Sequence, residues 1–435
     1  MKKNTHKIFL CTCLCLLLNI SCAKEKRNKR MSQIKVSAKE MLKPIDINEV
    51  NFFFENSASM NGYLEGDNFL EAMTRVIGNS ASEKLNTFFV NTDVHKAFNL
   101  LSKIEKKQIK VGNIGSSDHQ FIFKTAIEKA IDNNVSIVVT DGIYSVKGKN
   151  PSIVSVKIEQ TFERALKENA IEIVVLKMTS NFKGTYYSET CKPGHKAIKI
   201  NQTRPYYIFL FGNKDVINKT LENIVIKNDL KGLEEESRFI ITKNLKVNYT
   251  VLTQGMEKEG SFKQANHNPV VKVIGQAIKA SKNGVLLKDR HLQFGIAVDY
   301  SKSSIPDSYL LNVANYSIEN NTGYSIGAIK KVSDLDKTGI SYKWINDQNK
   351  KGAFNYTHII VVKAKTKLYG NLNLSLDRNS PEWIANTGSD DDCSINNDTS
   401  TTFSFDRLMT GISEAYQKVN NKEEFFKINI IVKAD

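Results

Sequence analysis

Two apolar runs in this 435-residue chain end in small side chains that carry oxygen. Glu55, Ser57 and Ser59 follow the first run, and Asp141 follows the second one further along the chain. Hard divalent cations such as Mg²⁺ prefer oxygen ligands and keep several waters. Two serines at i and i+2 on a tight turn can direct both hydroxyls to one point, and the two carboxylates balance the charge. We therefore predict a cation site with one coordination position open for an acidic group of a partner.

These motifs resemble the metal-ion-dependent adhesion site of the von Willebrand factor A domain, which uses Asp-x-Ser-x-Ser, a Thr before a helix, and an Asp in Thr-Asp-Gly. The matching segments are Glu55–Ser59 (Glu-Asn-Ser-Ala-Ser), Gly115–Asp118 (Gly-Ser-Ser-Asp) and Thr140–Gly142 (Thr-Asp-Gly). The resemblance covers residues 48–226. It implies that Mg²⁺, or Mn²⁺ or Ca²⁺ in its place, binds to Ser57, Ser59 and one of Ser116 and Ser117. It also implies that Glu55 and Asp141 complete the shell through water, and that the domain binds a partner rather than catalysing a reaction.

Glu55 departs from the pattern of the family, which has an aspartate at this position. The extra methylene moves the carboxylate by roughly a bond length. Changes in the groups that surround metal ligands typically weaken metal binding about 10- to 100-fold, or roughly 1.4 to 2.7 kcal/mol. The alternative to a working metal site is therefore a metal-free structural scaffold in which the serine-rich turn of Glu55 only packs.

Strands alternate with helices over residues 45–230, which predicts an α/β domain with a Rossmann-like, doubly wound parallel sheet. Ligands of such sheets bind at the carboxyl ends of the strands, where both motifs lie. The expected strands are Val50–Phe54, Leu85–Val90, Val135–Val139, Ile171–Leu176 and Tyr206–Phe211. The expected helices, which show apolar residues at helical spacing, are Asp67–Ile77 and Phe121–Ile131.

Residues 231–435 have a different texture, in which strand-like runs are separated by clusters of Asn, Asp, Gly, Ser and Lys. We expect a β-rich, sandwich-like second domain. Its predicted strands are Leu245–Leu252, Leu292–Val298, Ser308–Ile318, His358–Lys363 and Lys427–Val432. Its predicted helices are Pro269–Ala280 and Phe405–Val419.

The N-terminus has the pattern of a targeting segment. Basic residues precede an apolar core, Ile8–Leu18, which is too short to span a bilayer as a mature helix. The small residue Ser21 before Cys22 resembles the bacterial lipobox, although Asn19 stands where that motif has leucine. We expect residues 1–21 to be a lipoprotein signal peptide, Cys22 to be lipidated and residues 22–44 to be a charged tether. An ordinary secretory signal is the alternative. A lipid anchor implies the outer membrane of the cell envelope, on its periplasmic side or at the cell surface.

The formal net charge of +15 is concentrated near the N-terminus. Residues 1–30 carry eight Lys or Arg and one Glu, which gives 8 − 1 = +7, so the remaining 405 residues carry 15 − 7 = +8. These show no dense basic block and no arginine–aromatic pattern of nucleic-acid readout. The expected partners are therefore the membrane, through the anchor, and an unknown protein or surface ligand, through an acidic group.

Other residues leave alternatives open. Cys191 and Cys393, the two cysteines that follow Cys22, could form one disulfide or remain free thiols. Ser117 and His119 permit a less favoured function, that of an envelope hydrolase. The run Ser389–Asp392 is read as a solvated acidic turn, with a calcium loop as the weaker interpretation.

Overall fold

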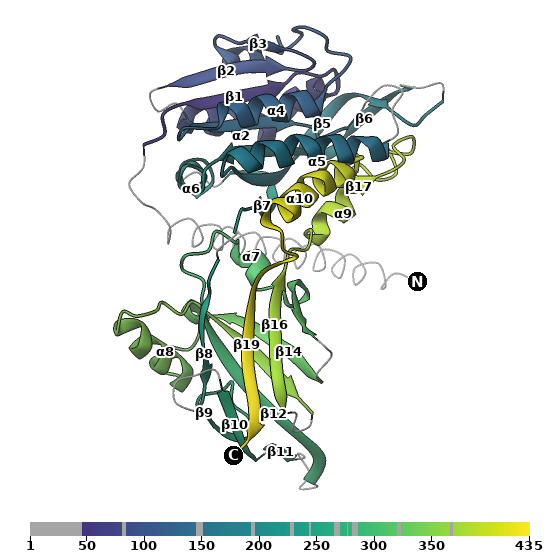
Figure 1. Cartoon of the computed structure of the whole chain (residues 1–435). Helices are drawn as coiled ribbons and strands as arrows, with labels where there is room; N and C mark the ends of the chain where they lie inside the picture. Colours follow the sequence, from purple (N-terminus) through teal and green to yellow (C-terminus); the bar gives the residue numbers. More distant parts are fainter. Residues whose placement is uncertain are drawn as a thin grey trace, which may run out of the picture. The chain divides into compact units, whose positions relative to one another are not determined.

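The chain forms two compact units (Figure 1). The computed structural model describes residues 46–80, 84–144, 151–192, 196–226, 230–242, 245–264, 270–275, 277–280, 286–319, 323–365 and 369–435. The predicted signal peptide, Cys22 and the tether to residue 44 lie outside these residues. The first unit runs to Phe239 and includes Glu382–Ile412, and the second comprises Ile240–Pro381 and Ser413–Asp435. Sequence reasoning placed one boundary at residue 230, whereas the structure groups Glu382–Ile412 with the first unit.

A seven-stranded sheet organises the first unit, with strand order β3-β2-β1-β4-β6-β5-β7. Its strands are β1 (Val50–Glu55), β2 (Leu85–Val90), β3 (Val94–Lys96), β4 (Val135–Thr140), β5 (Glu172–Ser188), β6 (Lys196–Gly212) and β7 (Leu233–Phe239). The expected parallel pairing is confirmed for β2, β1 and β4. It is wrong for the rest of the sheet, because β3, β5, β6 and β7 pair antiparallel with their neighbours. A short connection between consecutive strands such as β5 and β6 can only produce an antiparallel pair.

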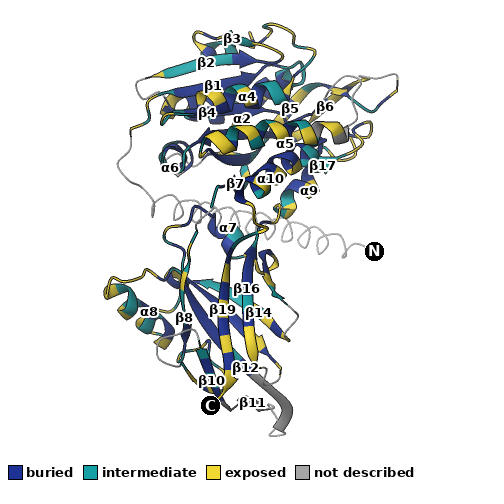
Figure 2. Ribbon diagram, viewed as in Figure 1, coloured by how far each residue is buried: buried dark blue, intermediate teal, exposed yellow. Residues whose placement is uncertain are grey.

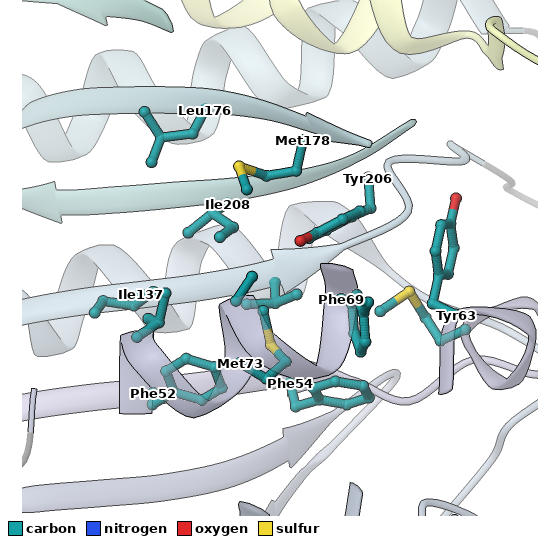
Figure 3. Close-up of a cluster of buried hydrophobic side chains, with 14 of the residues drawn as sticks. Phe52, Phe54, Tyr63, Phe69, Met73, Ile137, Leu176, Met178, Tyr206 and Ile208 are labelled. Carbon is teal, nitrogen blue, oxygen red and sulfur yellow. The ribbon is translucent and has the colours of Figure 1, made fainter. Parts of the chain in front are cut away.

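Helices cover both faces of this sheet. The α2 helix packs on the face that carries Phe52 and Phe54, and Figure 3 shows their side chains beside Phe69 and Met73 of α2. Phe123 of α4 packs on the opposite face against β6 and α5. The helical segments are η1 (Ser59–Glu65), α2 (Asp67–Ser80), α3 (Leu100–Glu105), α4 (His119–Lys129), α5 (Pro151–Glu168), α6 (Lys214–Leu221), η2 (Glu222–Ile226) and α9 (Glu382–Thr387).

The central strands β1 and β4 are mostly apolar and are buried along their whole length, because both faces of the sheet are covered. Every residue of β1 and β4 is buried (Figure 2). Two short strands, β17 (Gly388–Ser389) and β18 (Thr402–Phe403), pair with each other in the segment 382–412. The α/β class predicted from the sequence is confirmed, but the sheet is part parallel and part antiparallel rather than parallel throughout.

The second unit contains two β-sheets that share one apolar core. One sheet has β13 (Tyr316–Ile318), β16 (Gly370–Asp377), β19 (Glu424–Ala434), β10 (Val270–Gly275) and β9 (Ser261–Gln264). The other has β11 (Ala277–Ala280), β12 (Leu286–Asp299), β15 (His358–Ala364), β14 (Tyr324–Lys331) and β8 (Asn248–Leu252). Its helical segments are α7 (Asp307–Leu310), η3 (Val313–Asn315), η5 (Val332–Asp334) and α8 (Ile340–Lys350), and α10 (Phe405–Asn420) begins in the first unit and ends in this one.

Two predictions for this half are wrong. The described residues of the expected helix at 269–280 form strands β10 and β11, as suits the β-branched residues Val270, Val271 and Val273. The expected strand at 308–318 instead begins with helical turns and reaches β13 only at Tyr316. Within the described residues, no helix combines the length and the apolar character needed to cross a membrane.

Candidate metal-binding site

Three loops meet where β1 and β4 end. The two strands are paired in parallel, with Phe54 opposite Val139, so Glu55 and Thr140 leave the sheet side by side. The third loop precedes α4, and its Ile114 carbonyl accepts a hydrogen bond from the Ala58 amide at 2.8 Å. The expected meeting of the motif loops at one sheet edge is therefore observed.

These loops line a cavity of about 290 Å³ that is partly open to solvent. It is lined by Glu55, Ser57, Ala58, Ser59, Ile114, Gly115, Ser116, Ser117, Asp141, Ile143, Tyr187 and Glu189. Every side chain that the sequence predicted for the site is in this lining. Tyr187 and Glu189 were not predicted, because they lie at the far end of the β5–β6 hairpin and no local motif marks them.

Glu55 connects the other two loops. Its carboxylate is buried and accepts hydrogen bonds from the hydroxyls of Ser117 and Thr140, each at 2.5 Å. The longer side chain of glutamate thus reaches both hydroxyls directly. This contact gives a local reason for glutamate where the resembling family has aspartate.

Asp141 and the two serines of the first loop form a second group. The Ser59 hydroxyl donates to Asp141 Oδ2 at 2.5 Å, and the Ile143 amide donates to Asp141 Oδ1 at 3.1 Å. The hydroxyl oxygens of Ser57 and Ser59 are 3.0 Å apart. The predicted convergence of the i and i+2 hydroxyls is therefore present in the structure.

Both carboxylates are buried without a compensating cation among the described residues. Burial raises the pKa of Glu55 above its usual value. Burial, and then the nearby charge of Glu55, raise the pKa of Asp141 to about 7. No Lys or Arg of the described residues is among the largest contributions to these two pKa shifts. A bound cation would supply the missing positive charge, so the donor set fits the ion that the resemblance implies.

His119 is buried and joins this polar network through a hydrogen bond with Thr140, while its own ring stays neutral. Its Nε2 lies 3.1 Å from the Thr140 hydroxyl. Because the Thr140 hydrogen points to Glu55, His119 must donate from Nε2. Burial lowers the pKa of His119 to about 4, which keeps the ring neutral at physiological pH. The Ser117 hydroxyl donates to Glu55, so His119 and Ser117 serve different partners rather than forming a nucleophile–base pair.

The ligand types available in the cavity restrict how it could hold a metal. Across the described ranges, no group of three or more His, Cys, Asp or Glu side chains could hold a metal ion. A cation at this position would therefore depend on serine hydroxyls and water as well as on carboxylate. That combination suits a hard cation such as Mg²⁺ better than a soft one.

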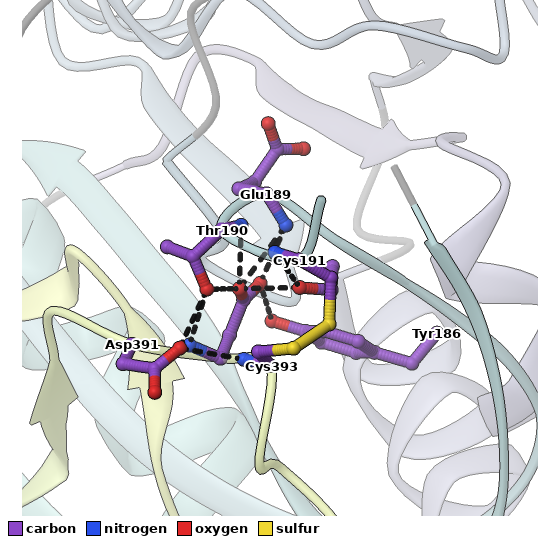
Figure 4. Close-up of a disulfide and its surroundings, with 8 residues drawn as sticks. Tyr186, Glu189, Thr190, Cys191, Asp391 and Cys393 are labelled. Atoms are coloured by element: carbon purple, nitrogen blue, oxygen red, sulfur yellow. Dashed lines mark hydrogen bonds between the residues drawn. A yellow bond between two sulfur atoms is a disulfide. The ribbon is translucent and has the colours of Figure 1, made fainter. Parts of the chain in front are cut away.

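A disulfide joins the hairpin that borders the cavity to a distant part of the chain. Cys191 and Cys393 are bonded across a sequence separation of 202 residues, which decides between the disulfide and the free thiols (Figure 4). Asp392, next to Cys393, is fully buried, so the prediction of a solvated acidic turn is wrong for this residue.

Comparisons of the chain with protein-family models, with curated proteins and with solved structures give no match. The functional assignment therefore depends on the geometry of the site itself.

Proposed function

We propose that this chain is a lipid-anchored binding protein of the bacterial cell envelope, with a von Willebrand factor A-like domain that recognises a partner through a divalent cation. Ser57, Ser59 and one of Ser116 and Ser117 would bind Mg²⁺, or Mn²⁺ or Ca²⁺, directly. Glu55 and Asp141 would complete the shell through water, and an acidic group of the partner would take the open position. The domain would comprise residues 45–230, followed by a β-rich sandwich.

One observation carries this proposal. Glu55 and Asp141 are both buried beside a hydroxyl-lined cavity, and no Lys or Arg of the described residues is among the largest contributions to their pKa shifts. Burying a charge is costly unless it is paired. A cation in the cavity removes this cost and leaves a positive site for an acidic ligand. The parallel strands β2, β1 and β4, with the motif loops at their carboxyl ends, support the proposed domain type.

A metal-free scaffold is the second candidate, and a specific observation favours it. Each oxygen of the two carboxylates already accepts a hydrogen bond, from Ser117 and Thr140 on Glu55 and from Ser59 and Ile143 on Asp141. A network satisfied in this way can hold the loops together without an ion.

Thermal and urea unfolding of residues 31–435 distinguishes the two candidates. The protein is measured in EDTA and then in Mg²⁺, Mn²⁺ or Ca²⁺ at matched ionic strength. An ion that binds only the native state adds about 2.7 kcal/mol at a hundredfold excess over its Kd. We expect that gain with at least one of the cations. Equal stability in EDTA and at millimolar concentrations of all three cations would favour the metal-free scaffold.

The proposed anchor has its own test. We expect Cys22→Ala to move the protein from the membrane fraction to the soluble fraction of fractionated cells, because lipidation requires the thiol of this cysteine. Ser21→Ala is the control, since alanine is also small and keeps the motif. Retention of the Cys22→Ala protein in the membrane fraction would contradict lipidation at this residue.

A further inference from the structure

Asp392 is a buried carboxylate that accepts an unusual number of hydrogen bonds from one short segment. The segment is the end of β5 and the turn after it, residues 186–190. The donors are the hydroxyls of Tyr186 and Ser188 and the main-chain amides of Glu189 and Thr190, at 2.7 to 3.1 Å (Figure 4). The Thr190 hydroxyl lies 2.7 Å from Asp392 and 2.6 Å from Asp391, so these two carboxylates share its one hydrogen. The Asp392 amide in turn donates to the Thr190 hydroxyl at 3.1 Å. Asp392 therefore fixes both the side chains and the backbone of this segment.

The strand geometry explains what this attachment achieves. Successive side chains of a β-strand point to opposite faces. Tyr186 and Ser188 point to Asp392 and are buried, whereas Tyr187 between them is 41% exposed and lines the cavity. Glu189 also lines the cavity, and its amide is bound to both oxygens of Asp392. One side of the segment is thus held by Asp392, and the other side forms a wall of the proposed binding site.

Additional contacts secure Asp392 itself. Cys393 is bonded to Cys191, just beyond the segment. In the same part of the chain, the exposed Asp390 pairs with Arg407 at 2.7 Å, and Thr402 shares a hydrogen bond of 2.9 Å with Tyr207 of β6. Asp392 is consequently presented to the hairpin by a part of the chain that is itself attached to the first unit.

We infer that Asp392 is a positioning residue for the binding site: it holds the wall formed by Tyr187 and Glu189 against the cation cavity, and the Cys191–Cys393 disulfide secures it there. This inference rests on the proposed function for the meaning of the cavity. It predicts a division of roles, in which the motif loops hold the cation and the Asp392-bound wall sets the surroundings that a partner's acidic group meets.

Hydrogen exchange tests the attachment without any ligand. In Asp392→Asn, an amide replaces one acceptor oxygen, and the negative charge is lost. We expect the amides of Glu189 and Thr190 to exchange at least tenfold faster, while the amides of β1 and α2 exchange at the wild-type rate. Asp390→Asn is the matched control, because Asp390 lies two residues away and pairs with Arg407 instead. Unchanged exchange at Glu189 and Thr190 in Asp392→Asn would overturn the inference.

Terbium luminescence then tests the connection to the cavity. Tb³⁺ is a hard cation that nearby tyrosines sensitise, so emission reports both its affinity and its distance from the tyrosines around the cavity, which include Tyr187. The Tyr187→Phe variant, in which Asp392 is intact, should show lower sensitised emission than the wild type, and the difference measures the contribution of Tyr187. Asp392→Asn should lower the emission by a similar factor and leave the Tb³⁺ affinity within about threefold of wild type. Emission and affinity that both match the wild type would show that Asp392 does not position this wall.

Two further arms keep the outcomes separate. If Asp392→Asn unfolds, Ser188→Ala is measured in its place, because it removes one hydrogen-bond donor to Asp392 and no charge. It should accelerate amide exchange at Glu189 and Thr190, by less than the tenfold expected for Asp392→Asn. Exchange at the wild-type rate in Ser188→Ala would contradict the inference. If Tb³⁺ does not bind the wild type, the cation function fails, while the exchange measurements still decide whether Asp392 fixes the hairpin.

Discussion

Replacing Asp141 by asparagine is expected to abolish stabilisation by divalent cations and to make the metal-free protein more stable above pH 7. Asp141 belongs to a buried pair of carboxylates, and its pKa is raised to about 7 by burial and then by Glu55. Asparagine keeps the shape of the side chain but carries no charge to bury and none to attract a cation. A mutation in a buried site that stabilises the metal-free protein would show that the pair is retained for binding rather than for folding.

The same pKa fixes the direction of the pH dependence in EDTA. In the unfolded chain Asp141 loses its proton near its usual pKa of about 4, whereas in the folded chain it keeps the proton up to about pH 7. The folded state therefore binds more protons in this range, and the unfolding free energy falls as the pH rises from about 4 to about 7. The raised pKa of Glu55 acts in the same direction. Asp141→Asn should flatten this slope.

The measurement is urea unfolding of wild type and Asp141→Asn at pH 5 and pH 8, with EDTA and with Mg²⁺. At pH 8 the wild type should gain about 2.7 kcal/mol at a hundredfold excess of Mg²⁺ over its Kd, and the variant should gain nothing. Asp118→Asn is the control, because Asp118 caps the start of α4 and asparagine is an equally good cap. An equal response to Mg²⁺ in wild type and Asp141→Asn would refute the proposed site.

Removal of the Cys191–Cys393 disulfide is expected to destabilise the first unit strongly and the second unit little. The bond closes a loop with a sequence separation of 202 residues, which includes Ile240–Pro381 of the compact second unit. Closing a loop of this order reduces the entropy of the unfolded chain by an amount worth about 4 to 5 kcal/mol. Cys191→Ser with Cys393→Ser should lower the unfolding free energy of the first unit by about that amount.

The two tryptophans allow the units to be followed separately. Trp383 lies in the first unit, where its indole donates to Ser237 at 3.0 Å, and Trp344 lies in α8 of the second unit. Urea unfolding is monitored by fluorescence in Trp344→Phe and Trp383→Phe backgrounds. The transition seen by Trp383 should move to lower urea, and the one seen by Trp344 should stay in place. Wild type under a reductant should match the double serine variant, which itself should not respond. A shift of both transitions by the same amount would contradict independent unfolding of the units.

The sequence by itself determined the central parallel strands of the first unit and the motif residues that follow two of them. Val50–Phe54 and Leu85–Val90 were identified to within one residue, because continuous apolar runs of this length suit strands covered on both faces. The motif residues follow the ends of β1 and β4, and because these two strands are parallel, their carboxyl ends lie at the same edge of the sheet. Hydroxyl and carboxylate oxygens at those ends were sufficient to predict which motif residues line one cavity, whereas cation binding there stays a prediction.

Only the tertiary structure decided the direction of β5 and β6, the disulfide and the wall of the cavity. The sequence marked Ile171–Leu176 and Tyr206–Phe211 as strands, but these runs lie in β5 (from Glu172) and β6, two strands of 17 residues that pair with each other. That extension places Tyr187 and Glu189 at the cavity, where the Glu189 amide donates to Asp392, more than 200 residues away in the chain. Local periodicity reports burial within one element, whereas strand pairing and hydrogen bonds across such separations depend on the whole fold.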